Sequence, residues 1–550
     1  MDIVLVGLPG SGKSVVGKRL AARHGAEFID LDERIEARDG RPIPTIFAED
    51  GEPAFRALER HAVADLGPAD EEATLRRIVA TGGGAVIDPR NRWSLYRGRM
   101  SVWLDGRPEV LAQRLRRSVH VRPLVTGRDP IGAIRDLATK RERFYAAADV
   151  RLAGVAEIGT VVDAIEVRQR AWSDDAAHHA TLVRAATPLG RLVLGTGIAG
   201  VAVGEALDRL EARRAIVVTE PGAWSAVGDR IGAALGPGER TVELVMLPQG
   251  EAAKRLAAVE AAASELARLR VGRDEPIVAV GGGALGDAAG FLAATYLRGV
   301  ALIHVPTTLV AQIDSSIGGK TAVDLPEGKN LVGAFHQPTD IVIDVELLAT
   351  LPERQRRAAL GEAVKMAALG DERLFELLER HGDEIARGDA ASVERGEVAE
   401  LVERCALAKL DVVLADERER GARGGRIQLN LGHSLGHAVE AAAGYEGLLH
   451  GEAVAYGLRA ACRIGTVVGI TPVDRAERIG RALDAIGLAT EPLPYDLDAV
   501  LGHLSTDKKH AAGKLRWVLP TATGYELRTD VPEEVVAEVA GSLLAAGSAR

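Results

Sequence analysis

The sequence predicts two α/β regions followed by a helical region, because three patterns succeed one another along its 550 residues. From residue 2 to about 170, short strand-like apolar runs alternate with helical patterns, which indicates a parallel sheet with helices on both faces. The polar stretch 171–179 lacks apolar periodicity and is typical of a linker. Strand-like runs resume over 180–344, and Ala-, Leu-, Glu- and Arg-rich helical patterns fill 345–550. We therefore expect a domain over 1–170, an α/β half over 180–344 and an all-helical half over 345–550.

The composition limits the classes of function. Apolar residues make up 47% and charged residues 27%, an ordinary globular composition. The net charge of −10 gives no electrostatic reason to expect a nucleic-acid partner. No apolar stretch approaches the ~18 residues of a membrane span, so we expect no membrane partner. The two isolated cysteines, Cys405 and Cys462, fit a reducing compartment and predict a cytoplasmic location.

A glycine-rich loop follows the first predicted strand. Residues 7–14 read GLPGSGKS, the G-x-x-x-x-G-K-[ST] pattern, and an amphipathic helix comes next. In such a loop the backbone wraps phosphate, the lysine bridges the β- and γ-phosphates and the final hydroxyl holds Mg²⁺. The sequence therefore predicts an ATP and Mg²⁺ site. Its expected residues are Gly10, Ser11, Gly12, Lys13 and Ser14.

Two aspartates and several glycine- and arginine-containing motifs come after this loop. The alternation of a predicted strand puts Asp30 and Asp32 on one side, although such a pair caps a helix as readily as it binds a ligand. The later motifs are GEPAFR (51–56), GGG (82–84), RPL (122–124) and KRERFY (140–145).

In this order the motifs resemble the shikimate kinase family, and the resemblance covers roughly residues 1–170. It implies that Asp32 binds the substrate hydroxyls and acts as the catalytic base. It also implies that Arg56 and Arg141 clamp the shikimate carboxylate, a planar anion suited to guanidinium groups. Gly83 is expected to pack against the substrate ring.

The same resemblance assigns the phosphate side of the site. Lys13 is implied as a catalytic cation and Asp30 as the carboxylate on the metal side. Arg122 is expected to close over the phosphates as part of a lid that excludes water.

The second region contains a glycine-rich motif after an apolar strand. Residues 280–287 read VGGGALGD and open a predicted helix, which departs from the strict dinucleotide pattern but has its context. A polar, glycine-rich run over 312–330 lies between apolar runs, which favours a ligand pocket over a solvent loop. We therefore expect a Rossmann-like fold that binds a dinucleotide.

Histidines and a glutamate in the helical region predict a metal site. His433 and His437 lie at i and i+4 on one helix face, His450 follows, and Glu362 lies upstream. Two histidines and one carboxylate with an open position are typical of catalytic zinc. Spacing alone makes His433 and His437 the natural pair.

From about 180 to 545 the chain resembles the 3-dehydroquinate synthase family, through motifs that include GGGALGD, PTTL, DSSIGGK, LNLGHSLGH and HGEAV. The family cyclises 3-deoxy-D-arabino-heptulosonate 7-phosphate with NAD and Zn²⁺ or Co²⁺. The resemblance corrects the spacing argument: it implies Glu362, His433 and His450 as metal ligands and leaves His437 to the substrate. The implied catalytic residues are Lys320, Glu419 and His437. The implied NAD contacts are Glu251, Lys254, Gly282, Gly283, Asp287, Thr307, Thr308 and Lys329. The implied substrate contacts are Arg298, Asp314, Lys320, Asn330, Lys365, Lys409, Asn430 and His437.

Two further substrate positions have competing candidates. The segment 422–430 is longer than the family pattern by three residues. Spacing to the following asparagine favours Arg426 as the substrate arginine, whereas spacing from the preceding lysine and glutamate favours Arg423; we take Arg426. Either Lys508 or Lys509 contacts the substrate, and we take Lys508.

Together the two resemblances imply a bifunctional enzyme of aromatic amino acid (chorismate) biosynthesis, with shikimate and a heptulosonate phosphate as its small-molecule substrates. The alternative is that the second region is another sugar-phosphate cyclase. A scaffold with decayed sites is disfavoured because the expected catalytic and metal residues are all in place. A homodimer through the second region is a further expectation.

Overall fold

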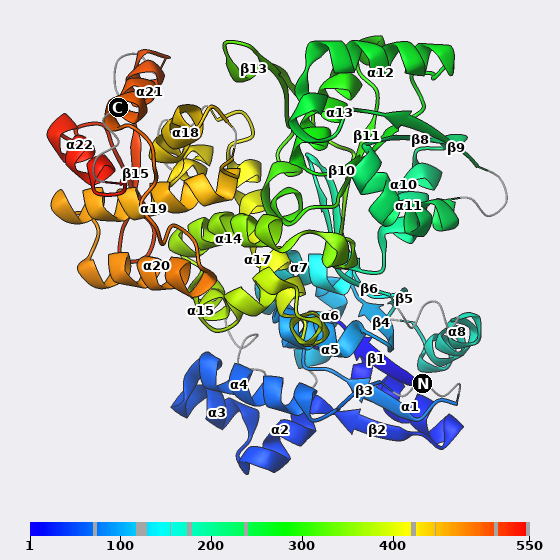
Figure 1. The fold of residues 1–550 in the computed structure, drawn as a ribbon. Coiled ribbons are helices and arrows are strands. Elements are labelled where there is room, and N and C mark those ends of the chain that lie inside the picture. Colours follow the sequence, from blue (N-terminus) through cyan, green and yellow to red (C-terminus); the bar gives the residue numbers. More distant parts are fainter. Residues whose placement is uncertain are drawn as a thin grey trace. The chain divides into compact units, whose positions relative to one another are not determined.

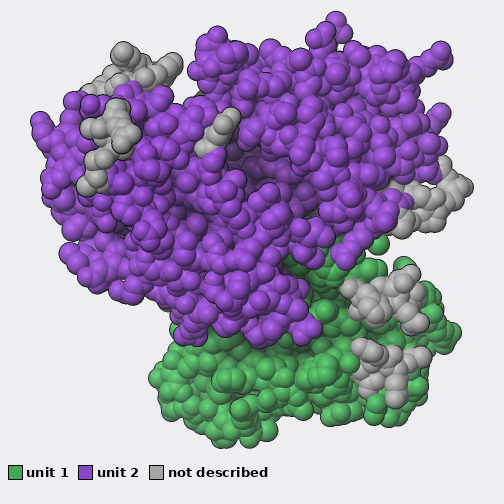
Figure 2. All heavy atoms as spheres, in the orientation of Figure 1, with its two compact units in different colours: residues 1–203, 342–346 green, residues 204–341, 347–550 purple. Residues whose placement is uncertain are grey.

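Two compact units make up the described part of the chain, coloured separately in Figure 2: residues 1–203 with 342–346, and residues 204–341 with 347–550. The structure, a computed structural model, describes residues 1–69, 74–116, 129–154, 156–172, 179–235, 240–419, 425–445, 447–510 and 515–545. No helix within these ranges is long and apolar enough to cross a membrane.

A five-stranded parallel sheet forms the centre of the first unit, with the strand order β2-β3-β1-β4-β5. Every residue of β1 is buried, but only Ile3 and Leu5 belong to the core that includes the first and last helices. Both faces of the sheet are therefore covered, and the predicted fold is confirmed (Figure 1). The strands are β1 (Asp2–Val6), β2 (Glu27–Asp30), β3 (Arg77–Ala80), β4 (Met100–Asp105) and β5 (Val150–Ala153).

Helices connect these strands. The first begins after Gly12 and ends before Gly25, whose φ angles of 96° and 64° suit glycine at both caps. The helices are α1 (Lys13–His24), α2 (Leu31–Asp39), α3 (Ile43–Glu49), α4 (Gly51–Ala64), α5 (Pro89–Tyr96), α6 (Pro108–Arg116), α7 (Pro130–Tyr145) and α8 (Ile158–Ala171), with a 3₁₀ turn η1 (Ala85–Ile87).

A seven-stranded sheet has the order β6-β7-β14-β11-β10-β8-β9. β6 and β7 are antiparallel, whereas β10 pairs in parallel with β8 and with β11. The Rossmann-like prediction is confirmed. The strands are β6 (Ala180–Thr187), β7 (Gly190–Thr196), β8 (Arg214–Thr219), β9 (Thr241–Met246), β10 (Ile277–Gly281), β11 (Leu302–Pro306) and β14 (Asp340–Asp344).

The connections of this sheet include one element that the sequence analysis did not foresee. Part of the polar run 312–330 forms an antiparallel hairpin of β12 (Lys320–Leu325) and β13 (Gly328–Phe335). The helices are α10 (Ala199–Arg209), α11 (Pro221–Leu235), α12 (Leu256–Arg268) and α13 (Gly283–Thr295), with shorter turns η2 (Gly250–Lys254), η3 (Tyr296–Arg298), η4 (Ala311–Ser315) and η5 (Val345–Thr350).

The chain after residue 350 is mostly helical, as predicted. One correction is a two-stranded hairpin, β15 (Trp517–Pro520) and β16 (Tyr525–Arg528), where only helices were expected. The helices are α14 (Glu353–Ala368), α15 (Glu372–Arg387), α16 (Ala390–Glu394), α17 (Glu397–Ala415), α18 (His433–Ala442), α19 (His450–Val467), α20 (Val473–Ile486), α21 (Leu497–His510) and α22 (Glu533–Gly541), with a 3₁₀ turn η6 (Arg426–Asn430).

Glycines allow α19 to approach both α14 and α18 closely (Figure 1). A Cβ at Gly451 in α19 would overlap the carbonyl oxygen of Ala358 in α14. A Cβ at Gly457 in α19 would overlap the carbonyl oxygen of Gly432, the residue that precedes α18. Backbone thus packs against backbone at both contacts, which only glycine permits.

Candidate active sites

The glycine-rich loop of the first unit forms a turn between β1 and α1. Gly7, Gly10 and Gly12 all have positive φ angles, of 142°, 82° and 96°. The Lys13 ammonium donates to the backbone oxygens of Gly7 at 2.8 Å and Leu8 at 3.1 Å, so it is held against the loop. The helix N-terminus and this ammonium together favour an anion.

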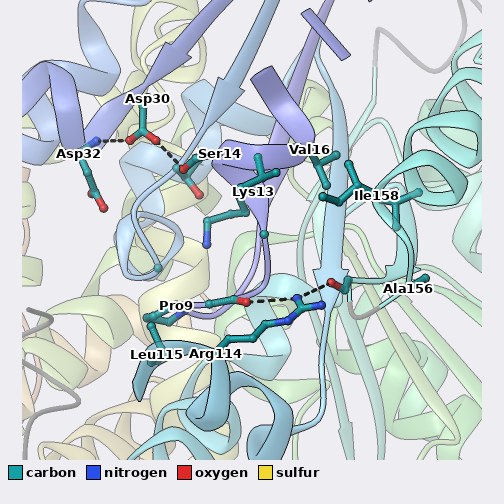
Figure 3. Close-up of a pocket in the computed structure, with 17 residues that line it drawn as sticks. Pro9, Lys13, Ser14, Val16, Asp30, Asp32, Arg114, Leu115, Ala156 and Ile158 are labelled. Carbon is teal, nitrogen blue, oxygen red and sulfur yellow. Dashed lines mark hydrogen bonds between the residues drawn. The ribbon is translucent and has the colours of Figure 1, made fainter. Parts of the chain in front are cut away.

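A cavity of about 430 Å³ opens from this loop (Figure 3). Its lining includes Gly10, Lys13 and Ser14 of the loop and α1 as well as Asp32 and Gly83. One cavity therefore connects the predicted phosphate residues to predicted substrate residues. Arg114, which the sequence analysis did not select, also lines it and donates to the backbone oxygen of Gly154 at 2.9 Å.

Asp30 and Asp32 occupy different elements, which corrects the expectation that both lie on a strand. Asp30 ends β2 and caps α2, because its carboxylate accepts from the backbone N–H groups of Asp32 and Glu33. Its second oxygen accepts from the Ser14 hydroxyl at 2.6 Å, as Figure 3 shows. Asp32 lies in the first turn of α2 and reaches the cavity from there.

The predicted carboxylate clamp contains an additional acidic residue. Glu59 is 1% exposed and pairs with Arg56 at 2.8 Å. Burial raises the pKa of Glu59, while the Arg56 guanidinium opposes that shift. Arg141 donates to the Gly83 backbone oxygen at 2.7 Å, so it is anchored beside the predicted ring contact. A carboxylate three residues after the arginine on α4 was the available sequence signal, because i and i+3 share a helix face.

A second site lies at a switch in the order of the parallel strands. The chain passes from β8 outward to β9, and β10 then pairs on the other side of β8. Ligands of such sheets bind beyond the carboxyl ends of the strands at this point. Gly282 follows β10 there and caps α13, whose first residue is Gly283. Thr307 and Thr308 follow β11, and the Thr307 N–H donates to the Gly281 oxygen at 3.0 Å.

Near this edge the structure brings three further predicted residues together. Lys254, which is 5% exposed, lies 2.9 Å from Asp287 and donates to the side-chain oxygen of Asn330. Asn330 has a φ of 58°, and its N–H donates to Asp324 at 2.7 Å. Glu251 is exposed on the same 3₁₀ turn as Lys254.

Buried ion pairs join the predicted substrate lysines to acidic residues. Lys409 lies 2.7 Å from Asp314, Lys365 lies 3.8 Å from Asp314, and Lys365 also pairs closely with Glu362. Burial lowers the pKa of Lys409, whereas for Lys365 the attraction of Glu362 outweighs burial and raises it. Four charged groups thus balance one another where η4 meets α14 and α17, which limits the cost of burying the two lysines and Glu362.

Another ion pair joins two residues predicted to be catalytic. Lys320, at the start of β12, lies 2.6 Å from Glu419, and the Asn430 amide donates to Glu419 at 3.4 Å. Arg426 is 4% exposed and donates to the backbone oxygens of Gly318 and Glu417.

For the remaining predicted residues the structure gives no contact with another site residue, or no side-chain position. Arg298 is exposed on the 3₁₀ turn after α13. Of Lys508 the structure describes only the helical backbone, in α21. Arg122 and Arg423 lie outside the described residues, so the choice between Arg423 and Arg426 stays a prediction.

Three predicted metal ligands converge from three helices. Glu362 Oε1 lies 3.4 Å from His433 Nε2 and 3.3 Å from His450 Nε2. Metal–ligand bonds of about 2.0–2.2 Å in a tetrahedron separate the ligand atoms by roughly 3.3–3.6 Å. The two distances from this carboxylate to the imidazoles therefore fit one Zn²⁺ or Co²⁺ ion, and ligand nitrogens of His433, His437 and His450 also lie within 4.8 Å of one another. His437 is exposed and its ring centre lies 5.2 Å from that of His433, so it borders the same space.

The surroundings of the two imidazoles differ. Burial lowers the pKa of His433 to about 3, and its Nδ1 lies 3.1 Å from the Leu431 oxygen. For His450, hydrogen bonds to Glu362 and Glu440 outweigh burial and raise the pKa to about 10. In both residues Nε2 is the nitrogen that faces Glu362.

Comparison with known proteins identifies both regions. The shikimate kinase family model matches residues 9–165, and the N-terminal and C-terminal 3-dehydroquinate synthase models match residues 244–358 and 359–510. The 3-dehydroquinate synthase of Symbiobacterium thermophilum is 45% identical over 330 residues, which cover 59% of this chain and 89% of that protein. That of Colwellia psychrerythraea is 43% identical over 300 residues, or 54% and 82% of the two chains.

A solved structure shares the fold and was determined with bound cofactors. The 2-epi-5-epi-valiolone synthase of Streptomyces hygroscopicus subsp. jinggangensis, with NAD⁺ and Zn²⁺ bound, is 28% identical with a TM-score of 0.58, over 64% of this chain and 96% of that one. The chain described here belongs to the 3-dehydroquinate synthase family, and its residues 9–165 form a domain of the shikimate kinase family.

Proposed function

We propose that this protein is a bifunctional enzyme of the shikimate pathway. One site phosphorylates the 3-hydroxyl of shikimate with ATP. The other cyclises 3-deoxy-D-arabino-heptulosonate 7-phosphate to 3-dehydroquinate with release of phosphate. The observation that carries the second activity is the spacing of Glu362, His433 and His450 beside the buried lysines, which supports a metal next to an anion-binding cluster.

In the kinase site, the residues around the cavity have separate roles. Lys13 neutralises charge on the transferred phosphoryl group, and Ser14 with Asp30 holds Mg²⁺. Asp32 accepts the proton of the attacked hydroxyl, which it reaches from the start of α2. Arg56 and Arg141 hold the substrate carboxylate, so that the hydroxyl stays in line with the phosphate.

In the cyclase site, Glu362, His433 and His450 would hold the metal. When bound, the metal would supply polarisation of a carbinol oxygen, and NAD⁺ would supply reversible hydride transfer. Lys365 and Lys409 bind and orient the anionic ends of the substrate, close to Asp314. Glu419, beside Lys320, accepts the proton whose removal precedes phosphate loss. His437 faces the substrate from the exposed side of α18.

The alternative is that the second site acts on another sugar phosphate. The 2-deoxy-scyllo-inosose synthase complexed with carbaglucose-6-phosphate, NAD⁺ and Co²⁺ is 28% identical, with a TM-score of 0.55 over 64% of this chain and 97% of that one. The 3-dehydroquinate synthases reach 41–45% identity. This difference favours the heptulosonate substrate.

Paired variants of the full-length chain test both activities. We expect Lys13→Ala to abolish shikimate-dependent ADP formation and leave dehydroquinate formation intact, and His433→Ala to do the reverse. Each variant then serves as the folding control of the other. If the folded, zinc-supplied wild type makes no dehydroquinate but releases phosphate from another sugar phosphate, the alternative replaces the proposal.

Further expectations concern organisation. We propose a kinase domain over 1–170, a linker over 171–179, an NAD-binding half over 180–344 and a helical half over 345–550. The place of β6 and β7 in the seven-stranded sheet supports the boundary near 180, whereas the division into compact units falls after residue 203. A homodimer through the synthase half and a cytoplasmic location are proposed as well. The cytoplasmic location agrees with Cys405 and Cys462, which are both buried and form no disulfide.

A further inference from the structure

Glu440 is a buried carboxylate to which the proposed reactions assign no role. It lies on α18 and is 5% exposed. It follows His433 by seven residues and His437 by three, so all three lie on one face of the helix. A carboxylate at this depth needs compensating partners, and the partners indicate what it does.

One oxygen of Glu440 contacts a proposed metal ligand. Glu440 Oε2 lies 3.0 Å from His450 Nδ1, and the other ring nitrogen, Nε2, lies 3.3 Å from Glu362 Oε1. An ionised carboxylate can only accept a hydrogen bond, so Nδ1 carries the proton in this contact. Once Nε2 has given up its own proton, its lone pair points to the place where the metal ligands converge.

The second histidine ligand is held by a different kind of acceptor. His433 Nδ1 lies 3.1 Å from the backbone oxygen of Leu431, which fixes its Nε2 toward Glu362 as well. The acceptor is a neutral carbonyl for His433 and a charged carboxylate for His450. A carboxylate makes the attached imidazole a more basic ligand, so Glu440 affects the metal through chemistry that the carbonyl does not supply.

The other oxygen of Glu440 faces a lysine of the β12–β13 hairpin. Glu440 Oε1 lies 3.8 Å from Lys329 Nζ, and that ammonium stands 4.7 Å from the centre of the Tyr445 ring. Lys329 belongs to β13 and is a proposed NAD contact. The single carboxylate therefore bridges a metal ligand and a residue of the dinucleotide side.

We propose that Glu440 is a positioning residue of the metal site. It holds His450 in the tautomer that is protonated on Nδ1, aims Nε2 at the ion and ties this imidazole to Lys329. The inference rests on the proposed metal site. Loss of such a partner of a metal-bound histidine typically weakens metal binding about 10- to 100-fold.

The test is a zinc titration of the metal-stripped full-length protein in competition with a chromogenic chelator. Glu440→Gln keeps the shape of the side chain and removes its charge, and we expect zinc binding about 10- to 100-fold weaker than in the wild type. Glu452→Gln is the matched control. Its carboxylate pairs with Arg354 and accepts from the Leu449 N–H, a bond that glutamine can also accept, so this change should leave zinc affinity unchanged.

Two further measurements separate positioning from a purely structural role. The visible absorption bands of the Co²⁺-loaded protein report ligand geometry, and we expect Glu440→Gln to shift them while Glu452→Gln does not. Glu440→Asp retains an ionised acceptor, so its zinc affinity should lie between those of the wild type and Glu440→Gln. If aspartate loses as much affinity as glutamine, the charge of Glu440 is not what matters and the inference is wrong.

The outcomes distinguish this inference from the metal site on which it rests. A wild type that binds no stoichiometric zinc would refute the metal site itself. A wild type that binds zinc, together with Glu440→Gln of equal affinity and an unchanged cobalt spectrum, would refute only the role of Glu440.

Discussion

At the scale of single residues, Asp30 and Asp32 have different structural roles although they lie only two residues apart. Asp30 stabilises the start of α2 and receives the Ser14 hydroxyl, whereas Asp32 lines the cavity. The sequence predicted that both aspartates belong to the kinase site, but it did not show that they lie on different elements. A strand and a helix present side chains two residues apart in different directions, and the end of β2 falls between the two.

This division predicts that the two variants differ in stability, whereas both lose kinase activity, because Asp30 is a proposed Mg²⁺ partner and Asp32 the proposed base. Asp30→Ala should reduce the free energy of unfolding of the first unit by about 1 kcal/mol, because the α2 cap is lost. Asp32→Ala should leave stability nearly unchanged and lower kcat for shikimate phosphorylation about 10²- to 10⁴-fold, because the base is removed. Urea unfolding and steady-state kinetics on both variants check this. An active Asp32→Ala enzyme would exclude the proposed base.

At the scale of elements, the metal site depends on how closely three helices pack. Gly361, Gly432 and Gly451 each stand next to a proposed ligand, and all three lie at backbone contacts of α14, α18 and α19. The sequence contained these glycines beside the ligands, but their partners are distant in the chain. Only the fold reveals that these glycines lie where the helices that carry the proposed ligands pack together.

Gly451→Ala is therefore expected to weaken the site without touching a ligand. The added methyl group would overlap the Ala358 oxygen and push α19 from α14, at a cost of about 1–3 kcal/mol in unfolding free energy. Zinc affinity, measured by chelator competition, should fall as well. Gly480→Ala in α20 is the matched control. Its Cβ would meet the nearest atom at 3.6 Å, so unchanged or slightly higher stability is expected.

The two hairpins are the elements that the sequence analysis predicted least well. β12 and β13 contain Lys320, Lys329 and Asn330 as well as glycines. These polar residues interrupt the apolar–polar alternation from which a strand is predicted. β15 and β16 are four residues each, too short to establish a period beside long helices. The central strands were predictable because burial on both faces makes them continuously apolar.

At the scale of the whole molecule, the chain contains separate hydrophobic cores. One core joins β1, β3 and β4 to α1 and α8, and another joins β8, β10 and β11 to α12 and α13. The motif order and the two sets of alternating elements were enough to predict two catalytic regions. The grouping of β6 and β7 with the first compact unit was not predictable, because it depends on contacts distant in sequence.

Separate cores predict separate responses to ligands in thermal unfolding. An ATP analogue with shikimate should raise the melting temperature of one transition, and NAD⁺ with Zn²⁺ that of the other. At 100 times Kd each contributes about 2.7 kcal/mol. Differential scanning calorimetry of the full-length protein checks this. A single transition that rises equally with either set would show that the two regions unfold together.

The paired lysines of the cyclase site have a consequence for anion selectivity. Lys320, Lys365 and Lys409 each already have a carboxylate partner. Chloride or sulfate has a single charge centre, so each ion could replace only one of these carboxylate partners. Such an anion therefore gains little free energy by binding to the site. A ligand with a carboxylate and a phosphate at the right separation can replace several partners at once. The acidic residues thus compete with small anions for the lysines, and we expect the site to select ligands by the separation of their charged groups.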